Sequence, residues 1–147
     1  MTSSTGPHFR ELDPAECREL IARNHVARIA FSFHDRVDIE PIGYVSDGDW
    51  LYGRTSVGTK LSTLLHHPWC AVEMDEVSGL FDWTSVVVKG TFHLLDPETG
   101  STDRYQRAER LLRKLVPGTF QANDPTPQRG IVFGVHASEV SGRSARS

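Results

Sequence analysis

Three strand-forming segments follow one another with only short turns between them, and this feature limits the possible folds most. Residues 26–33, 37–45 and 50–54 are dense in β-branched and aromatic side chains, which favour strands. The Asp47-Gly48 pair before the third segment is a strong hairpin signal. Connections this short indicate antiparallel neighbours, because a parallel pair needs a crossover of about a dozen residues or more.

The remainder of the chain shows no regular alternation of strands and helices. We predict three more strands, at residues 69–75, 83–95 and 130–140, and three helices, at residues 13–24, 58–65 and 101–116. A doubly wound parallel sheet would require strands and helices to alternate. We therefore expect a mainly β fold, a six-stranded antiparallel barrel with flanking helices.

Three positions carry specific local predictions. Asp13 can cap the first helix, and Glu16 can complete a capping box with it. Pro41 cannot donate to a strand ladder, so it implies an edge, a bulge or a position that faces a ligand. Gly90 suggests a bend in its strand or the close approach of another backbone.

The composition fits one globular domain. The chain has 147 residues, of which 38% are hydrophobic and 24% are charged, enough for a single core. We expect a flexible arm over residues 1–10, the folded domain over residues 11–143 and a tail over residues 144–147.

Charge and hydropathy exclude several classes of partner. The net charge of −3 argues against a general nucleic-acid binder, whose affinity needs an excess of Lys and Arg. No apolar run approaches the about 18 residues of a membrane span. The N-terminus also lacks the regions of a signal peptide, so we expect a cytoplasmic protein without membrane contacts.

The cysteines and histidines do not form a recognisable metal site. Cys17 and Cys70 lie far apart in the sequence, so we expect two reduced and buried thiols. His66 and His67 are adjacent, whereas chelation from a helix needs a spacing of four. We expect no metal ion.

The stretch from 51 to 65 has the chemistry of an anion-binding site. It passes from a strand into a short helix, and a helix start has backbone N–H groups without partners. Arg54 and Lys60 bring positive charge, and Thr55 and Thr59 bring hydroxyl groups. A phosphate group suits this set best. Solvated surface charges beside a turn would give the same pattern, and this alternative stays open.

The glycine spacing in this stretch is similar to that of the phosphate loop of nucleoside triphosphatases. However, Thr59-Lys60 reverses the Lys-Ser/Thr order that the loop requires. The antiparallel context also differs from the strand-loop-helix unit of those enzymes. We therefore reject a triphosphatase site.

Several short motifs together resemble the pyridoxamine 5′-phosphate oxidase-like flavoproteins, in particular the small branch related to nitroimidazole-resistance proteins. The resemblance covers about residues 10–143. Its motifs are Tyr52-x-Arg54-Thr55-x3-Thr59-Lys60, His67-Pro68, Val72-Glu73-Met74-Asp75-Glu76, Cys17-x2-Leu20, Val26-Ala27-Arg28-Ile29-Ala30, Trp83-x-Ser85-Val86-x-Val88-x-Gly90 and Val140-Ser141-Gly142-Arg143.

The resemblance implies a six-stranded split β-barrel that forms a homodimer, with one FMN in each of two clefts between the subunits. It implies that the FMN phosphate is held by Arg54, Thr55, Thr59 and Lys60. The strand around Pro41, Ile42 and Gly43 would lie along the isoalloxazine ring. Trp83 and Ser85 would contact the flavin, and the resemblance is compatible with their serving the site of the other subunit. Trp83 as a core or interface aromatic, and Ser85 as an ordinary strand residue, are the alternatives.

The chain departs from the pattern of the family that it resembles at one position of interest. Nitroimidazole-resistance proteins carry a functional histidine where this chain has Gly53, so their histidine-dependent chemistry is not expected. The C-terminal Arg and His pattern of true pyridoxamine phosphate oxidases is not evident either. We name no catalytic residue.

Two classes of function follow from the resemblance. The first is an FMN-dependent oxidoreductase acting on a small molecule, with NAD(P)H as a candidate electron donor; the flavin brings its own reactivity, so no catalytic acid or base need stand out. The second is a flavin-binding or storage protein without turnover. A deazaflavin in place of FMN stays open, and haem, for which His34, His93 or His136 would be needed as ligands, is not expected.

Overall fold

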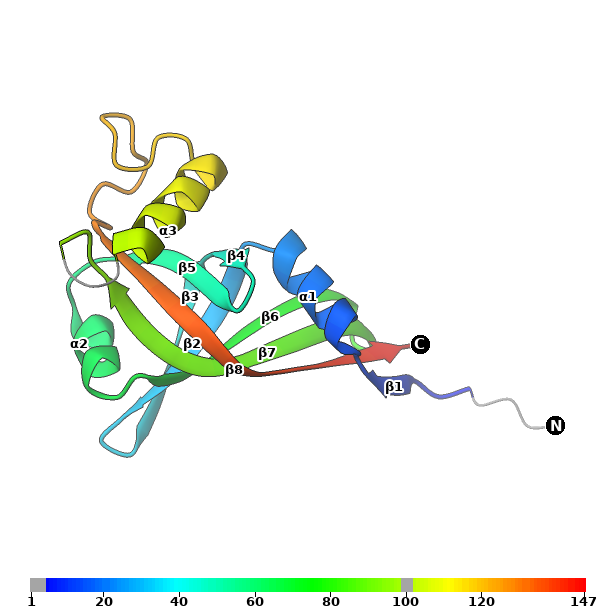
Figure 1. Ribbon diagram of the computed structural model, residues 1–147. Coiled ribbons are helices and arrows are strands. Elements are labelled where there is room, and N and C mark those ends of the chain that lie inside the picture. The colour runs from blue at the N-terminus through cyan, green and yellow to red at the C-terminus, as the bar shows by residue number, and fades with distance from the viewer. Residues whose placement is uncertain (1–4, 99–101) are drawn as a thin grey trace.

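The computed structural model describes residues 5–98 and 102–147 and shows a strongly bent antiparallel sheet with three helices (Figure 1). The helices are α1 (Pro14–Arg23), α2 (Thr59–His66) and α3 (Thr102–Leu115). The strands are β1 (His8–Glu11), β2 (Val26–Phe33), β3 (Arg36–Gly43), β4 (Val45–Asp47), β5 (Trp50–Thr55), β6 (Trp69–Gly79), β7 (Asp82–Leu95) and β8 (Ile131–Arg146). Across the sheet they run β3-β2-β6-β7-β8-β5-β4, with β1 beside β8.

The mainly β, antiparallel split-barrel fold is confirmed, but the predicted number of six strands was wrong. The described part of the chain forms eight strands. One addition, β4, occupies the start of the predicted hairpin turn and pairs with β5. The other, β1, was expected to be irregular because its four residues carry no strand-forming pattern.

Within the described residues, strand pairing extends closer to both ends of the chain than the sequence predicts. β1 pairs with the end of β8, with His8 opposite Arg146 and Glu11 opposite Arg143. β8 runs to Arg146, through most of the predicted tail, because it pairs with β1 on one side and β7 on the other. Backbone hydrogen bonds thus order segments that have few apolar side chains. Residues 1–4 of the predicted arm and the predicted helix start at Ser101 lie outside the described residues.

The first core lies inside the barrel and is closed at one end by α1. Asp13 and Glu16 form the predicted capping box, with hydrogen bonds of 2.8 and 3.1 Å. The helix then buries Cys17, Leu20 and Ile21 against the inner face of the sheet. The Tyr44 hydroxyl donates to the carbonyl oxygen of Ile21 at 2.7 Å, which fixes α1 to the strands.

A second, smaller core lies on the opposite face of the sheet, beneath α3 (Figure 1). Its buried members are Tyr52, Leu95, Ala108, Leu112 and Val132. Side chains alternate between faces along a strand, so β5 and β8 contribute to both cores. This alternation decides on which side of the sheet each predicted site residue lies.

Two close backbone approaches shape the barrel. A Cβ atom at Gly90 would lie 2.0 Å from the carbonyl oxygen of His136, which confirms the predicted close approach there. A Cβ atom at Gly53 would lie 2.8 Å from the carbonyl oxygen of Gly43 and 2.5 Å from the Phe133 ring. The barrel is therefore closed where β3 and β5 come together.

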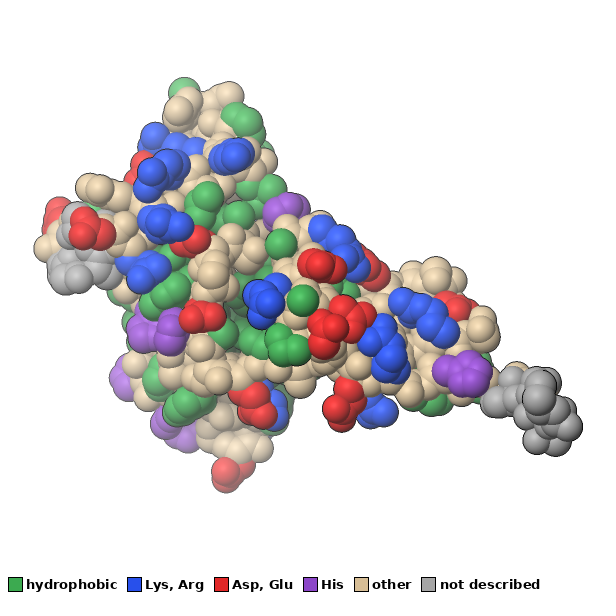
Figure 2. Space-filling model, turned by 45° about the vertical axis from the view of Figure 1, so that its right-hand side comes forward, with side chains coloured by type: hydrophobic (Ala, Val, Ile, Leu, Met, Phe, Trp, Pro, Cys, Tyr) green, Lys and Arg blue, Asp and Glu red, His purple; other side chains and the backbone are tan. Residues whose placement is uncertain are grey.

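The surface mixes charges of both signs. On the face shown in Figure 2, acidic and basic side chains lie among one another, with apolar side chains exposed between them. None of the helices in the described part of the chain is both long and apolar enough to span a membrane.

Candidate functional site

The start of α2 carries the predicted anion-binding residues. α1 has a side-chain cap, but among the described residues no side chain caps α2, which begins after Gly58. Its first backbone N–H groups are therefore available to an external acceptor. Thr59 is exposed there, and the Lys60 side chain, 18% exposed, forms an ion pair of 3.1 Å with Glu40.

Barrel closure brings the middle of β3 to this helix start. Glu40 of β3 contacts Lys60 directly, and Gly43 lies against Gly53 of β5. Pro41 is exposed on the outer face of the sheet, whereas Ile42 is buried in the first core. A ligand along β3 would thus meet the side chain of Pro41, but only the backbone of Ile42.

Thr55 lies at the end of β5 and faces the inside of the barrel. It is 6% exposed, and its hydroxyl donates weakly to the carbonyl oxygen of Ser56 at 3.4 Å. The Ser56, Val57 and Gly58 segment that follows is exposed. Thr55, Thr59 and Lys60 are therefore neighbours along one short turn.

Arg54 lies on the other face of the sheet and is fully engaged by the segment between α3 and β8. Its guanidinium donates to Asp124 at 2.7 and 3.1 Å, to the hydroxyl and carbonyl oxygens of Thr126, and to the carbonyl oxygen of Arg129. It also lies over the Phe120 ring, 4.4 Å from its centre. The hydrogen bond from Arg54 holds the pKa of Asp124 well below its usual range.

Ser85 belongs to a polar cluster on the outer face, which is formed by Arg28, Glu73, Asp75 and Ser85. The Ser85 hydroxyl donates to Glu73 at 2.8 Å, and Arg28 pairs with Asp75 at 3.2 Å. Burial, and then the neighbouring Asp75 carboxyl, raises the pKa of Glu73. Arg28 is also opposite Pro41 in the β2–β3 ladder. The spacing of neighbouring strands puts Pro41 roughly 14 Å from β7.

Trp83 lies at the far end of the sheet. It is opposite Ala145, near one end of β8, whereas Thr55 is opposite Ile131 at the other end. A strand rises about 3.3 Å per residue, so these points are roughly 45 Å apart along β8. Within one chain, the structure does not bring Trp83 to the α2 start.

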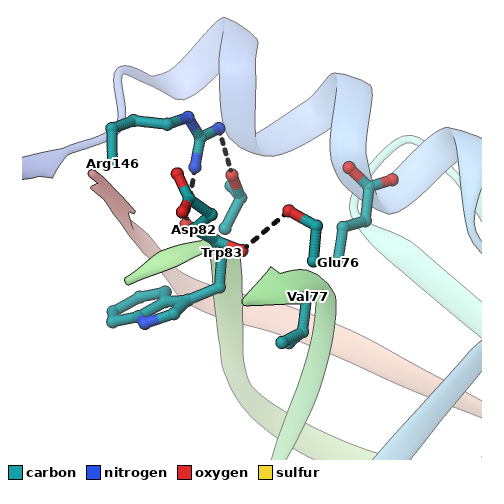
Figure 3. Close-up of a pocket in the computed structure, with 7 residues that line it drawn as sticks. Glu76, Val77, Asp82, Trp83 and Arg146 are labelled. Carbon is teal, nitrogen blue, oxygen red and sulfur yellow. Dashed lines mark hydrogen bonds between the residues drawn. The ribbon is translucent and has the colours of Figure 1, made fainter. Parts of the chain in front are cut away.

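A polar cavity of about 360 Å³ lies at the β6–β7 hairpin, and Trp83 is one of the residues that line it. In Figure 3 the Trp83 ring and Val77 lie on one side of the hairpin, and Arg146 and Glu76 reach toward α1. Arg146 donates to the Trp83 carbonyl oxygen and to the Thr84 hydroxyl, both at 2.9 Å. Glu76 accepts from Arg23 at 2.7 and 2.8 Å, which, with Asn24, lowers its pKa to about 2. Asp82 accepts from the backbone N–H and the hydroxyl of Ser147 at 3.0 and 2.7 Å, so the charged side chains that line this cavity all have hydrogen-bond partners within the chain.

Gly53 cannot be replaced by a larger residue without a change in the barrel, because the Phe133 ring occupies the space next to it. Sequence reasoning missed Glu40, Asp124 and the outer-face partners of Ser85. The alternation of β2 and β6 could have placed Arg28, Glu73 and Asp75 on one face, but nothing local links Arg54 to Asp124.

The family model described as pyridoxamine 5′-phosphate oxidase matches residues 13–144. An uncharacterised protein from Rhizobium meliloti is 30% identical in an alignment 146 residues long. The alignment covers 92% of this chain and 95% of the relative.

Two solved structures share the fold. An FAD-binding protein from Mesorhizobium loti is 25% identical with a TM-score of 0.76, covering 95% of this chain and 99% of the other. An FAD-binding protein from Mycobacterium smegmatis is also 25% identical, with a TM-score of 0.67 and coverage of 92% and 98%. The split barrel is thus common to all three structures. Because the family model matches nearly the whole chain, this protein belongs to the pyridoxamine 5′-phosphate oxidase family.

Proposed function

We propose that this protein binds a flavin whose phosphate lies at the start of α2. One observation carries the proposal: the barrel brings an uncapped helix start, with Thr59 and Lys60, next to the exposed backbone around Pro41. Amide N–H groups, hydroxyls and an ammonium are the donors that phosphate oxygens accept. The solved relatives are described as FAD-binding proteins, which supports a flavin.

The residues fit such a ligand in their chemistry. Thr55, Thr59 and Lys60 would hold the phosphate, and Pro41, Ile42 and Gly43 would line the ring system. The side chain of Glu40, the present partner of Lys60, is 46% exposed. When the ligand binds, the Lys60 ammonium would leave Glu40 and contact the phosphate. The site accounts for one phosphate group, and FMN carries only one, whereas FAD would need further contacts for its second phosphate and adenosine. FMN is therefore our proposed cofactor, with FAD and a deazaflavin as outcomes that the experiment distinguishes.

We assign Arg54 a positioning role rather than a direct contact with the phosphate. Its guanidinium would reach a phosphate only by leaving Asp124, Thr126 and Arg129. Arg54 instead fixes the end of β5 to the segment that leads into β8. Since Thr55 follows directly, this attachment sets where α2 begins.

We also propose a homodimer in which Trp83 and Ser85 complete the site of the partner subunit. The outer face of the β3-β2-β6 region exposes several apolar side chains, as an interface would require: Val26, Val37, Ile39, Trp69 and Val77 are 62–77% exposed. Ser85 lies on the same outer face, in the cluster with Arg28. Association through this face would bring β7 of one subunit near β3 of the other.

The proposed activity is that of an oxidoreductase acting on an unidentified small molecule. A bound flavin supplies electron transfer through its ring system. The chain itself would bind the phosphate, orient the ring against β3 and, through the second subunit, exclude water. NAD(P)H is the proposed electron donor. A storage protein would bind the flavin equally well without turnover, and the cytoplasmic location stays a prediction from the sequence.

The first experiment is the visible spectrum of the purified protein, followed by identification of any pigment released on denaturation. Release of FMN supports the proposal, and FAD or deazaflavin would change the cofactor. A colourless protein that binds none of the three would refute it.

A matched pair of variants tests the phosphate site. Lys60→Ala should weaken FMN binding roughly 10- to 100-fold, the value of a hydrogen-bonded charge, and leave riboflavin binding unchanged. Lys114→Ala, on the exposed face of α3, is the control. Equal loss for FMN and riboflavin would show that Lys60 does not contact the phosphate.

Turnover separates the enzyme from the storage protein. Bleaching of the bound flavin by NADH or NADPH without oxygen, followed by steady oxidation of the donor with a quinone or nitroaromatic acceptor, supports an oxidoreductase. Retention of flavin with neither reaction supports storage.

A further inference from the structure

A second cavity, of about 200 Å³, lies between α1 and the strands β5, β7 and β8. Its wall is mostly apolar. The apolar side chains are Pro14, Ile21, Leu51, Val88, Ala137 and Val140, and the remaining lining residues are Arg18, Gly48 and Asp49. An apolar cavity of about 150 Å³ can hold benzene, so this one can hold a ligand slightly larger than a single ring. It contains none of the residues proposed to bind the flavin.

The walls of this cavity are fixed by contacts within the chain. The Tyr44 hydroxyl holds the carbonyl oxygen of Ile21 at 2.7 Å, so the inner side of α1 cannot move away from the sheet independently. The backbone N–H of Ala137 donates to the carbonyl oxygen of Asp49 at 2.8 Å, which attaches the β4–β5 turn to β8. The cavity is therefore formed before any ligand arrives.

Two opposite charges line the cavity without pairing. Arg18 comes from α1 and Asp49 from the β4–β5 turn. Within residues 5–98 and 102–147, neither side chain has a hydrogen bond or an ion pair. Other charged side chains beside α1, such as Arg10 with Glu16 and Arg23 with Glu76, are paired. Arg18 and Asp49 thus differ from these two pairs, and both are exposed at the rim of the cavity.

We propose that this cavity binds a small zwitterion with an apolar body, namely a free α-amino acid with a side chain of about the size of leucine. The carboxylate of such a ligand would meet Arg18, its ammonium would meet Asp49, and its side chain would contact Leu51, Val88 and Val140. Since Arg18 and Asp49 are both exposed, a ligand with only one charge would pair with one of them and leave the other to solvent. The complementarity of charge and volume thus selects this class of ligand.

The experiment titrates the protein with L-leucine and follows backbone amide shifts by NMR. Shifts confined to α1 and residues 47–51 and 137–140 are expected. Two probes each lack one charge: 4-methylpentanoate has no ammonium and 3-methylbutylamine has no carboxylate. Each should bind roughly tenfold more weakly than L-leucine.

Variants of Arg18 and Asp49 test whether each charge contacts the ligand. Arg18→Gln and Asp49→Asn should each weaken L-leucine binding roughly tenfold, and Arg36→Gln and Asp38→Asn on exposed parts of β3 are the matched controls. Val140→Phe changes a side chain that is 42% exposed, so it should reduce binding by filling the cavity without loss of the fold. Amide spectra of each variant verify folding.

Two results would overturn the proposal. One is the lack of localised shifts at millimolar L-leucine. The other is equal affinity for L-leucine and 4-methylpentanoate with no effect of Asp49→Asn, which would indicate a site for simple carboxylic acids. Neither result affects the flavin proposal, because Lys60 and Pro41 lie outside this cavity.

Discussion

The guanidinium of Arg54 donates to both carboxylate oxygens of Asp124, which lies 70 residues further along the chain. The two side chains are only 8% and 3% exposed. The backbone N–H groups of Phe120 and Thr126 also donate to this carboxylate, both at 2.9 Å. One carboxylate therefore organises the whole segment between α3 and β8 and attaches it to β5.

Removal of the negative charge of Asp124 should destabilise the fold. Asp124→Asn leaves a buried arginine without its counter-charge, so the Tm should fall by several degrees. Differential scanning calorimetry measures the change, and Asp35→Asn in the exposed β2–β3 turn is the control. An unchanged Tm would mean that the pair contributes nothing net to stability.

The Arg54–Asp124 pair also predicts how the stability of the fold depends on pH. Because the pKa of Asp124 is lowered in the folded state, its stabilisation is present above the ordinary carboxyl pKa, about 4, and is lost as the pH falls below it. The difference in urea midpoint between the wild type and Asp124→Asn should therefore shrink from pH 6 to pH 3. Glu16 and Glu76, whose pKa values Arg10 and Arg23 lower to about 2, contribute equally to both proteins. A constant difference would contradict this account.

The closure of the barrel at Gly53 should not tolerate a side chain. Gly53→Ala forces the Phe133 ring and the Gly43 carbonyl oxygen apart, at an expected cost of about 1–3 kcal/mol. Gly130→Ala is the matched control, since no atom lies within 4 Å of its added Cβ. Urea unfolding of the two variants provides the comparison. Equal stability would show that β3 and β5 separate easily.

The two thiols should be inert in the folded protein. Cys17 and Cys70 are 3% and 7% exposed, and burial raises the pKa of the Cys70 thiol to about 12. Only a thiolate reacts readily, so a disulfide reagent at pH 8 should modify two thiols after denaturation and almost none before it. Fast reaction of one thiol without denaturant would show local opening of the core.

Mixed dimers test whether Trp83 serves the partner's site. Suppose that each flavin site takes Lys60 from one subunit and Trp83 from the other. Co-refolding of Lys60→Ala with Trp83→Ala then gives heterodimers in which one of the two sites has both wild-type residues. Flavin should then fill roughly a quarter of all sites. If both residues served a site within one chain, mixing would restore none. The outcome distinguishes a shared site from one that lies within a single subunit.

The sequence by itself determined the elements whose signals are local. The capping box at Asp13, the hairpin at Asp47-Gly48 and the close backbone approach at Gly90 follow from side-chain chemistry within a few residues, and the structure contains each of them. The antiparallel fold followed from the short connections between strands. The motifs added the family, which the family model confirms.

Only the tertiary structure decided which of these residues meet. β1 and the end of β8 form because each provides backbone partners to the other, a stabilisation that no hydrophobic pattern records. Arg54 and Thr55 are neighbours in sequence, yet the alternation of β5 sends Arg54 to Asp124 and Thr55 into the barrel. Barrel closure brings Lys60 to Glu40 and leaves Trp83 far away along β8. A sequence names the chemical groups of a site, whereas the path of the sheet sets the distances between them.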